Sequence, residues 1–453
     1  MKDILDDNKT RFITVAMTDT NGLLRGQKVS RGSFEGILDA GMGMAPVTFA
    51  LDPTDEFLDI PGVTDETADF HDSPLIVDPT SVRSIPWERD GDNLLVLSNY
   101  TGETAAMCPR ALLRSVLDKG TGAGLNLKYG LELEYMLFNE TAETLREKGF
   151  RNLTPATMHP SHDLLIYQTT QAEWYSDVAD MCEALKIDLA KMHEEIGAGF
   201  MEACTGAGMG LAPADQTVLL KNFMRALATR QGKSITYMAR WSEEADSQSA
   251  HVHLSLKGDD GTPLFWDDSK PDNMSDTFRY FIGGMQTYLG EMMLLFAPTV
   301  NSYRRFAPGT FAPPALTWGV ENRTTCFRVV GHDAGSLRVE NRLPGSDANP
   351  YLTVAATLAA GLAGIADKIE PDAATVGNGY VPSETEPRAY PRNMDDAIAA
   401  LRGSSFAREW LGEVFVDAFT STRESQNNAF KGCLLYTSPS PRDKRQSRMP
   451  SSA

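Results

Sequence analysis

The sequence of 453 residues is long enough for a large hydrophobic core and a smaller second domain, and its 42% hydrophobic and 23% charged residues are ordinary for a soluble globular protein. The formal net charge of −19 argues against nucleic acid or a membrane surface as a partner, because both are polyanionic. An anionic substrate would therefore need a local cluster of arginine or lysine side chains.

The cysteines indicate a reducing compartment, and we expect a cytoplasmic protein. Their number is odd and no two form a CxxC pair, which argues against a disulfide framework or a zinc ribbon. They are Cys108, Cys182, Cys204, Cys326 and Cys433. The charged start of the chain lacks the apolar run of a signal peptide, and the apolar stretch 352–365 is short and predicts a buried helix, not a membrane span.

Residues 1–105 predict a small, strand-rich domain. The β-type runs are residues 11–19, 75–78 and 93–100. Asn21-Gly22 is a turn signal. A helix is expected at 109–120, with Pro109 in its first position, and we place the domain boundary just before it.

From residue 106 to 432, strands and helices alternate, which predicts a second, larger domain and an α+β fold. The expected strands are residues 127–138, 234–241, 250–258 and 337–343. The expected helices are part of 173–195, then 212–232, 277–297 and 349–369. In the last of these, Asn349 suits the N-cap and Pro350 the first turn.

Residues 433–453 differ abruptly from the rest in composition. They are rich in Ser, Pro and Arg and show no periodicity, which is typical of a disordered tail. We interpret them differently, because CLLYTSPSPRD resembles the translation of a sequencing-library adapter. The natural sequence is then expected to end near Gly432, and we assign the tail no function.

Three expected strands place chemically active side chains at alternating positions. Side chains two residues apart on a strand point to the same face, roughly 6.6 Å apart along it. The sets are Glu132 with Glu134, His251 with His253 and Ser255, and Glu340 between Arg338 and Arg342. A sheet with such a polar face does more than pack a core.

Each of these sets alone has an ordinary explanation. Paired glutamates usually lie on a solvated strand face, and paired histidines are a weak sign of a metal site. However, like charges at this spacing repel each other, which is costly near a core unless cations compensate. Carboxylate and imidazole ligands together suit Mg²⁺ or Mn²⁺, so the joint occurrence predicts a metal site.

Two further segments add charged groups. Glu195 and Glu202 lie on either side of a glycine-containing stretch, just after His193. The segment 301–328 contains Arg304, Arg305, Arg323 and Arg328. Arginine binds carboxylates and phosphates through paired hydrogen bonds, so this cluster predicts an anionic substrate. Surface ion pairing is the alternative, and we accept it for Arg304.

The chain resembles the glutamine synthetase family in five motifs that occur in the family's order. They are LELEYMLF, AHVHLSL, NSYRRFAPG, WGVENRTT and RVENRLPGSDANPYL. RFITVAMTDTNGLLRGQKV resembles the family's N-terminal domain. The resemblance extends from about residue 12 to 432 and implies a small β-grasp domain followed by a large catalytic domain, with a curved antiparallel sheet flanked by helices.

The resemblance also implies roles for individual residues. One metal ion would be held by Glu134, Glu195 and Glu202, and a second, which clamps the ATP phosphates, by Glu132, His251 and Glu340. Nucleotide contacts would come from His253, Ser255 and Arg338, glutamate contacts from Arg305 and Arg342, and stabilisation of the transferred phosphoryl group from Arg323 and Arg328. The implied reaction transfers a phosphoryl group from ATP to the γ-carboxylate of glutamate, and nitrogen then attacks the γ-glutamyl phosphate.

Four departures from the family pattern lie on the side of glutamate and nitrogen. Phe311 replaces the flap glutamate, and Ala50 stands where the family has an ammonium-binding aspartate, with Asp52 the nearest acid. Phe200 replaces a glutamine. The loop 246–249 reads DSQS where the family has NGSG. Ammonium needs an anionic pocket and a base, so the loss of two acids and the gain of an aromatic ring favour an alkylamine acceptor.

Three hypotheses follow from these observations. The first is a glutamine synthetase that uses ammonia in nitrogen assimilation. The second is a γ-glutamyl-amine ligase for methylamine or a polyamine. The third is a non-catalytic assembly protein of the same fold, which the six intact metal-ligand positions argue against. The family resemblance further implies a homo-dodecamer of two stacked hexameric rings.

Overall fold

The computed structural model describes residues 10–51, 56–58, 60, 64–66, 69–88, 93–160, 162–307, 309–381 and 387–432. Asp52 and the tail 433–453 with Cys433 lie outside these residues. The other four cysteines are free and buried. No helix of the described residues is long and apolar enough to cross a membrane.

The N-terminal part of the chain forms a six-stranded sheet with the order β2-β1-β6-β4-β3, and β5 pairs with β6. Its strands are β1 (Phe12–Thr18), β2 (Leu24–Ser30), β3 (Met42–Met44), β4 (Ser73–Val77), β5 (Arg83–Ser84) and β6 (Asn93–Tyr100). Only the β1–β6 pair is parallel. Helix α2 (Arg31–Ala40) packs Phe34 into the same hydrophobic cluster as Ile13 and Val15 of β1, so this sheet has a core of its own.

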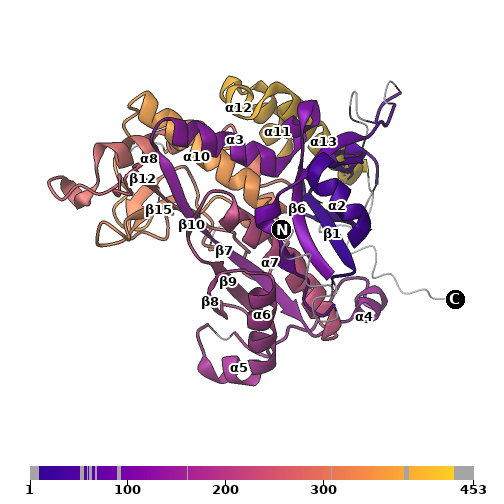
Figure 1. The fold of residues 1–453 in the computed structure, drawn as a ribbon. Helices are drawn as coiled ribbons and strands as arrows, with labels where there is room; N and C mark the ends of the chain where they lie inside the picture. Colours follow the sequence, from indigo (N-terminus) through magenta and orange to yellow (C-terminus); the bar gives the residue numbers. More distant parts are fainter. Residues whose placement is uncertain are drawn as a thin grey trace.

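The second sheet has nine strands in the order β13-β14-β15-β12-β7-β9-β8, and β10 and β11 also pair with β7. Its strands are β7 (Asn126–Phe138), β8 (Leu189–Glu194), β9 (Phe200–Thr205), β10 (Gly208–Met209), β11 (Ser234–Thr236), β12 (Val252–Lys257), β13 (Trp318–Val320), β14 (Phe327–Val330) and β15 (Arg338–Asn341). All neighbouring pairs are antiparallel except β13–β14. The long strand β7 is therefore the centre of the sheet (Figure 1).

Helices cover the apolar side of this sheet. The main ones are α3 (Pro109–Gly122), α6 (Ala172–Ala184), α7 (Ala212–Arg230), α8 (Asp276–Tyr288) and α10 (Pro350–Ala366). Shorter ones are α4 (Ala142–Glu147), α5 (Leu165–Thr170) and α9 (Met293–Phe296). One core cluster joins α3, α8 and α10 to β12 and the start of β7, and another joins α6 and α7 to the second half of β7. Helix α10 is apolar around most of its circumference because it is buried on nearly every side.

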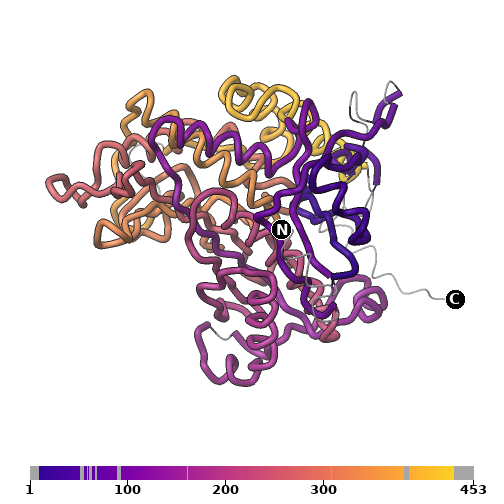
Figure 2. Tube along the Cα trace, in the orientation of Figure 1, coloured from indigo at the N-terminus to yellow at the C-terminus, as the bar shows by residue number. Residues whose placement is uncertain are grey.

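The C-terminal helices return to the N-terminal sheet. They are α11 (Met394–Gly403), α12 (Ser405–Leu411) and α13 (Glu413–Gly432). Figure 2 shows this yellow segment beside the indigo start of the chain. Arg423 of α13 donates from Nη1 to Asn21 Oδ1 at 2.8 Å in the turn between β1 and β2. In that turn Gly22 adopts a positive φ of 77°, as the Asn-Gly turn signal predicts.

The sequence-based elements are confirmed with four differences. The expected helix 277–297 is interrupted, because α8 ends at Tyr288 and α9 begins at Met293. The expected strand 234–241 is only β11, Ser234–Thr236. In 173–195, helix α6 gives way to strand β8. Strand β9, which carries Glu202, was not among the elements predicted from the sequence.

Candidate active site

Strand β7 separates its side chains between a core and a polar face. Leu131 belongs to one hydrophobic cluster and Leu133 to the other, while Glu132 and Glu134 point to the opposite side. The neighbouring segment is paired to the same stretch, because Glu132 N donates to His251 O and Glu134 N to Ser249 O, both at 3.0 Å. The alternation predicted from the sequence thus places both carboxylates beside the histidine segment.

These carboxylates line a cavity of about 520 Å³. Its charged and imidazole lining groups are Glu132, Glu134, His162, Asp163, Lys191, His193, Glu195, Glu202, Asp246, His251, Arg323, Arg328, Glu340 and Arg342. All six residues predicted to bind metal ions are in this set. The lining thus holds seven carboxylates against four lysine or arginine side chains, so the cavity has an excess of negative charge among the described residues.

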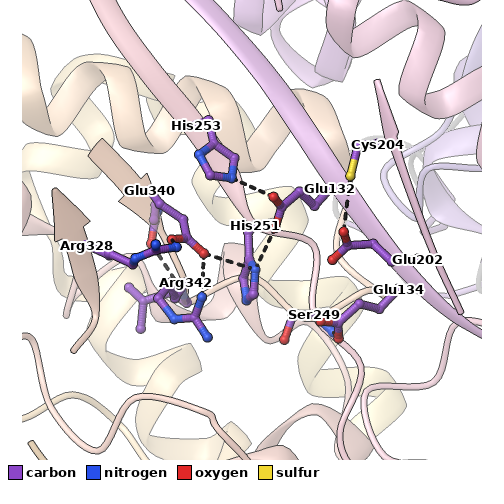
Figure 3. A network of polar contacts seen from close by, with 12 residues as sticks. Glu132, Glu134, Glu202, Cys204, Ser249, His251, His253, Arg328, Glu340 and Arg342 are labelled. Carbon is purple, nitrogen blue, oxygen red and sulfur yellow. Dashed lines mark hydrogen bonds and ion pairs between the residues drawn. The ribbon is translucent and has the colours of Figure 1, made fainter. Parts of the chain in front are cut away.

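One half of the carboxylate cluster is organised around His251 (Figure 3). Its Nδ1 lies 3.0 Å from Glu132 Oε2 and 3.2 Å from Glu340 Oε1. Burial alone would raise the pKa of Glu132, but His253 and His251 hold this pKa well below its usual range. Burial would likewise raise the pKa of Glu340, but Arg342 and His251 lower this pKa to about 2. Both carboxylates are therefore anionic at neutral pH.

In the other half of the cluster, burial and like charges outweigh the nearby positive groups at two of the three glutamates. Glu134 on β7 and Glu202 on β9 are register partners, and both are buried. Burial, with Glu202 and Glu195, raises the pKa of Glu134 well above its usual value. Burial and Glu132 raise the pKa of Glu202 to about 7. The pKa of Glu195 is instead lowered. Burial would raise it, but His193 Nε2, 3.1 Å from Glu195 Oε1, lowers it by more.

The four arginines predicted to contact substrates take different positions. Arg328 donates from Nη1 to Glu340 Oε2 at 3.1 Å, and Arg342 Nη1 also donates to Glu340. Arg323 is exposed at the edge of the cavity. Arg305 does not line the cavity: it is fully buried and donates from Nη2 to Ser249 Oγ at 2.9 Å and to Arg342 O at 2.8 Å.

The three residues predicted to contact the nucleotide lie in an adjoining cavity of about 300 Å³. His253, Ser255 and Arg338 line it together with Glu132, which is common to both cavities. Arg338 Nε donates to His253 Nδ1 at 3.1 Å, and His253 Nε2 lies 2.9 Å from Glu132 Oε1. One glutamate thus joins the two cavities.

Several cavity residues were not singled out from the sequence. Cys204 donates from Sγ to Glu202 Oε1 at 3.1 Å, and Lys191 Nζ lies 3.5 Å from the same oxygen. His162 Nδ1 lies 3.6 Å from Glu195 Oε2. Cys204 could have been found, because it follows Glu202 at the spacing that places both on one strand face. His162 had no such signal.

The donor set fits divalent cations. Three groups among the described residues bring ligand atoms within 4.8 Å of one another: Glu132 with His253 and Glu340, Glu132 with Glu202 and Cys204, and His193 with Glu195 and Glu202. The residues Glu134 and His251, expected among the ligands, lie beside these groups, and His251 Nε2 is buried without a hydrogen-bond partner among the described residues. Buried carboxylates that repel one another, together with an unpartnered imidazole nitrogen, are what a hard cation would stabilise.

A family model described as "Glutamine synthetase, catalytic domain" matches residues 106–434, which is well over half of the chain. A relative from Dictyostelium discoideum, "Type-1 glutamine synthetase 2", is 32% identical over 427 residues, covering 93% of this chain and 82% of that protein. The chain belongs to the glutamine synthetase family. It is accordingly an ATP-dependent carbon–nitrogen ligase of the glutamine synthetase type.

Two other known proteins are similar to this member of the glutamine synthetase family over nearly the whole chain. A Pseudomonas protein named glutamate–isopropylamine ligase is 28% identical, covering 95% of both chains. The solved structure described as "Apo GmaS without ligand" matches with a TM-score of 0.83 and 25% identity, covering 98% of both chains. The similarity therefore extends to a relative whose name gives isopropylamine as the acceptor.

Proposed function

We propose that this chain joins the nitrogen of a small primary amine to the γ-carboxylate of glutamate, with ATP as the source of energy. The observation that carries the proposal is the lining of the large cavity. Carboxylates and arginines suited to metal ions and a phosphoryl group share it with Phe311, whose side chain is 53% exposed, and Ile196, which is 48% exposed. Exposed apolar side chains in a charged cavity favour an acceptor that carries apolar surface.

The reaction we propose has two steps. The γ-carboxylate oxygen of glutamate attacks the γ-phosphorus of ATP, which forms γ-glutamyl phosphate and releases ADP. The amine nitrogen then attacks the γ-carbon, loses a proton and displaces phosphate. Arg323 and Arg328 would neutralise the transferred phosphoryl group, and His253, Ser255 and Arg338 would hold the nucleotide. Arg342 would bind glutamate, and Arg305 would support it by holding Ser249 and the Arg342 main chain.

Bound Mg²⁺ or Mn²⁺, two or more ions per site, would supply charge neutralisation for the phosphates and the carboxylate. The proposed ligands are Glu134, Glu195 and Glu202 on the glutamate side, and Glu132, His251 and Glu340 on the ATP side. His193 and His253 are additional candidates from the spacing of their nitrogens. The chain's own contribution is to fix these donors on strands or directly beside strand ends, where packing of the opposite face of the sheet holds them.

The arrangement of the whole protein belongs to the same proposal. We propose a β-grasp domain over residues 1–105 and the catalytic domain over 106–432, in a cytoplasmic homo-dodecamer of two rings. The separate core of the first sheet supports the domain division. The four free cysteines support the reducing compartment.

Ammonia is the second candidate acceptor, because the relative from Dictyostelium discoideum is a named glutamine synthetase and that function was our first expectation. The test is ADP formation by the purified chain with ATP, glutamate and Mg²⁺ or Mn²⁺, with ammonia, methylamine, ethylamine or isopropylamine as acceptor. Mass spectrometry of the amide identifies the product. We expect γ-glutamyl alkylamides; ADP formation with ammonia alone would assign a glutamine synthetase, and no amine-dependent ADP would contradict both.

A further inference from the structure

The end of the large cavity near Glu195 has a different character from the carboxylate cluster. It is lined by Ile196, Asp246, Thr310 and Phe311. Two apolar side chains and one carboxylate outside the cluster thus line the same cavity as the proposed metal ligands. None of the six proposed metal ligands belongs to this set, which we call the acceptor end.

Two loops are tied together at the acceptor end. Ser247 Oγ donates to Thr310 O at 2.9 Å, and both residues are buried. Asp246 immediately precedes Ser247, and Phe311 immediately follows Thr310. This one hydrogen bond therefore helps to position both side chains. Gln248 N, which donates to Ala239 O at 2.7 Å, fixes the loop from the other side.

Phe311 is held in an uncommon backbone conformation. Its φ is +54°, in the left-handed region that a bulky residue rarely adopts and that costs of the order of a few RT. Thr310 Oγ1 donates to Ala307 O at 2.8 Å just before it and helps to hold the turn. The chain therefore keeps a half-exposed aromatic ring at the cavity wall in spite of the strain.

No side chain or main-chain group of the described residues directly contacts the carboxylate of Asp246. Among the described residues it makes no hydrogen bond and no ion pair, whereas the cavity's other non-cluster acid, Asp163, lies near His162 and is 63% exposed. The pKa of Asp246 is raised, mainly by burial. Arg240 acts to lower this pKa, and Glu195 acts to raise it further. An unpaired carboxylate beside another anion and an apolar wall is a site that a cation would stabilise.

We propose that Asp246 binds the ammonium group of the acceptor amine, while Phe311 and Ile196 cover its alkyl group. This inference rests on the proposed function and names the residue that selects a cationic, monoalkyl acceptor. It also accounts for the absence of acids at positions 50 and 311, because the anionic group is supplied from the loop 246–249 instead. Asp246 is a specificity-determining residue and is given no part in phosphoryl transfer.

The test compares two nucleophiles on Asp246→Asn. Methylamine is a cation at neutral pH, whereas hydroxylamine is uncharged and does not need an anionic partner. We expect the KM for methylamine to rise by roughly tenfold to a hundredfold, as the loss of a charge-assisted hydrogen bond predicts, while kcat and KM for hydroxylamine change less than about twofold. The KM values for glutamate and ATP should also remain unchanged.

The matched control is Glu244→Gln, which removes one negative charge from the same loop at an exposed residue that does not line the cavity. It should leave both nucleophiles unaffected. Equal losses for methylamine and hydroxylamine in Asp246→Asn, or no loss for either, would overturn the inference. If Asp246→Asn fails to fold, Asp246→Ser gives the same comparison. A wild-type chain without activity toward any nucleophile would instead refute the proposed function.

Discussion

Glu134 and Glu202 lie directly opposite each other on β7 and β9, and both side chains are buried. Two carboxylates in this relation destabilise the fold unless protons or cations neutralise them, since like charges opposite each other across a strand pair repel. Burial, together with Glu202, raises the pKa of Glu134, and burial, together with Glu132, raises the pKa of Glu202 to about 7. The pair is therefore best explained as a binding feature that is kept at the expense of stability.

Removal of this repulsion should stabilise the metal-free protein. In excess chelator, Glu202→Gln is expected to increase the free energy of unfolding by roughly 0.5–1 kcal/mol, and it should abolish ligation with metal present. Mg²⁺ or Mn²⁺ should raise the Tm of the wild type more than that of the variant. Urea unfolding and calorimetry measure these effects.

Glu147→Gln is the control for this charge removal, because Glu147 is exposed on α4 and outside the cavity. It should change neither stability nor metal response beyond about 0.5 kcal/mol. Full ligation by the wild type in excess chelator, or an equal metal response in Glu202→Gln, would contradict the assignment of the cluster.

Local periodicity explains why much of the fold and of the carboxylate cluster could be predicted. The alternation of Glu132 and Glu134 with two leucines depends only on strand geometry, and the structure places the leucines in the core and the glutamates in the cavity. Strand β9 could not be found in this way, because all six of its residues are buried and it shows no alternation.

Other features depend on contacts that no local pattern records. Arg305 was expected at the substrate, but its position behind Ser249 follows from hydrogen bonds to residues that are distant in sequence. The position of Asp246 depends on a bond between Ser247 and Thr310, which lie 63 residues apart. The spacing of His193 and His253 relative to the carboxylates is set by side-chain conformation, which the sequence does not specify.

The pair between Asp78 and Arg110 predicts a pH dependence of stability. Arg110 Nη2 donates to Asp78 Oδ2 at 2.8 Å and joins the end of β4 to α3. Burial would raise the pKa of Asp78, but the hydrogen bonds from Thr80 and Arg110 lower this pKa to about 2. Because this folded pKa is depressed, the stabilisation is complete above the unfolded pKa of about 4 and is lost as the pH falls toward 2.

Asp78→Asn should therefore be less stable than the wild type at pH 7, by about 1 kcal/mol for a partly exposed pair, and the difference should vanish between about pH 4 and pH 2. Urea unfolding of both proteins across this range gives the comparison. Asp118→Asn, an exposed position on the same helix, is the control. A difference that stays constant with pH would show that the pair does not titrate as described.

Ser249 connects the buried Arg305 to the cavity. Its hydroxyl oxygen accepts from Arg305 Nη2 at 2.9 Å, and its main-chain N–H donates to the Glu134 carboxylate. Ser249→Ala leaves buried guanidinium donors without this acceptor, so the free energy of unfolding should fall by about 1.5–3 kcal/mol. The control Ser115→Ala, at an exposed position on α3, should stay within about 0.5 kcal/mol. Equal stability of the two variants in urea would exclude a structural role for the Ser249 hydroxyl.

Phe311 offers the last prediction, because its half-exposed ring stands where the family has an acid. Covering one methyl group of the acceptor is worth about 0.8 kcal/mol, roughly a fourfold preference for methylamine over ammonia. This gain is opposed by the higher proton affinity of methylamine, which must lose a proton before it attacks. We therefore expect the wild type to use both acceptors with comparable kcat/KM. Phe311→Ala should lower kcat/KM about fourfold for methylamine alone, and Phe311→Glu should raise kcat/KM for ammonia. Measured values of kcat/KM for the two acceptors test these expectations. Phe150→Ala is the control, because Phe150 is exposed and lies outside the cavity. A wild type that strongly prefers ammonia, with no gain in Phe311→Glu, would mean that this ring does not tune the acceptor.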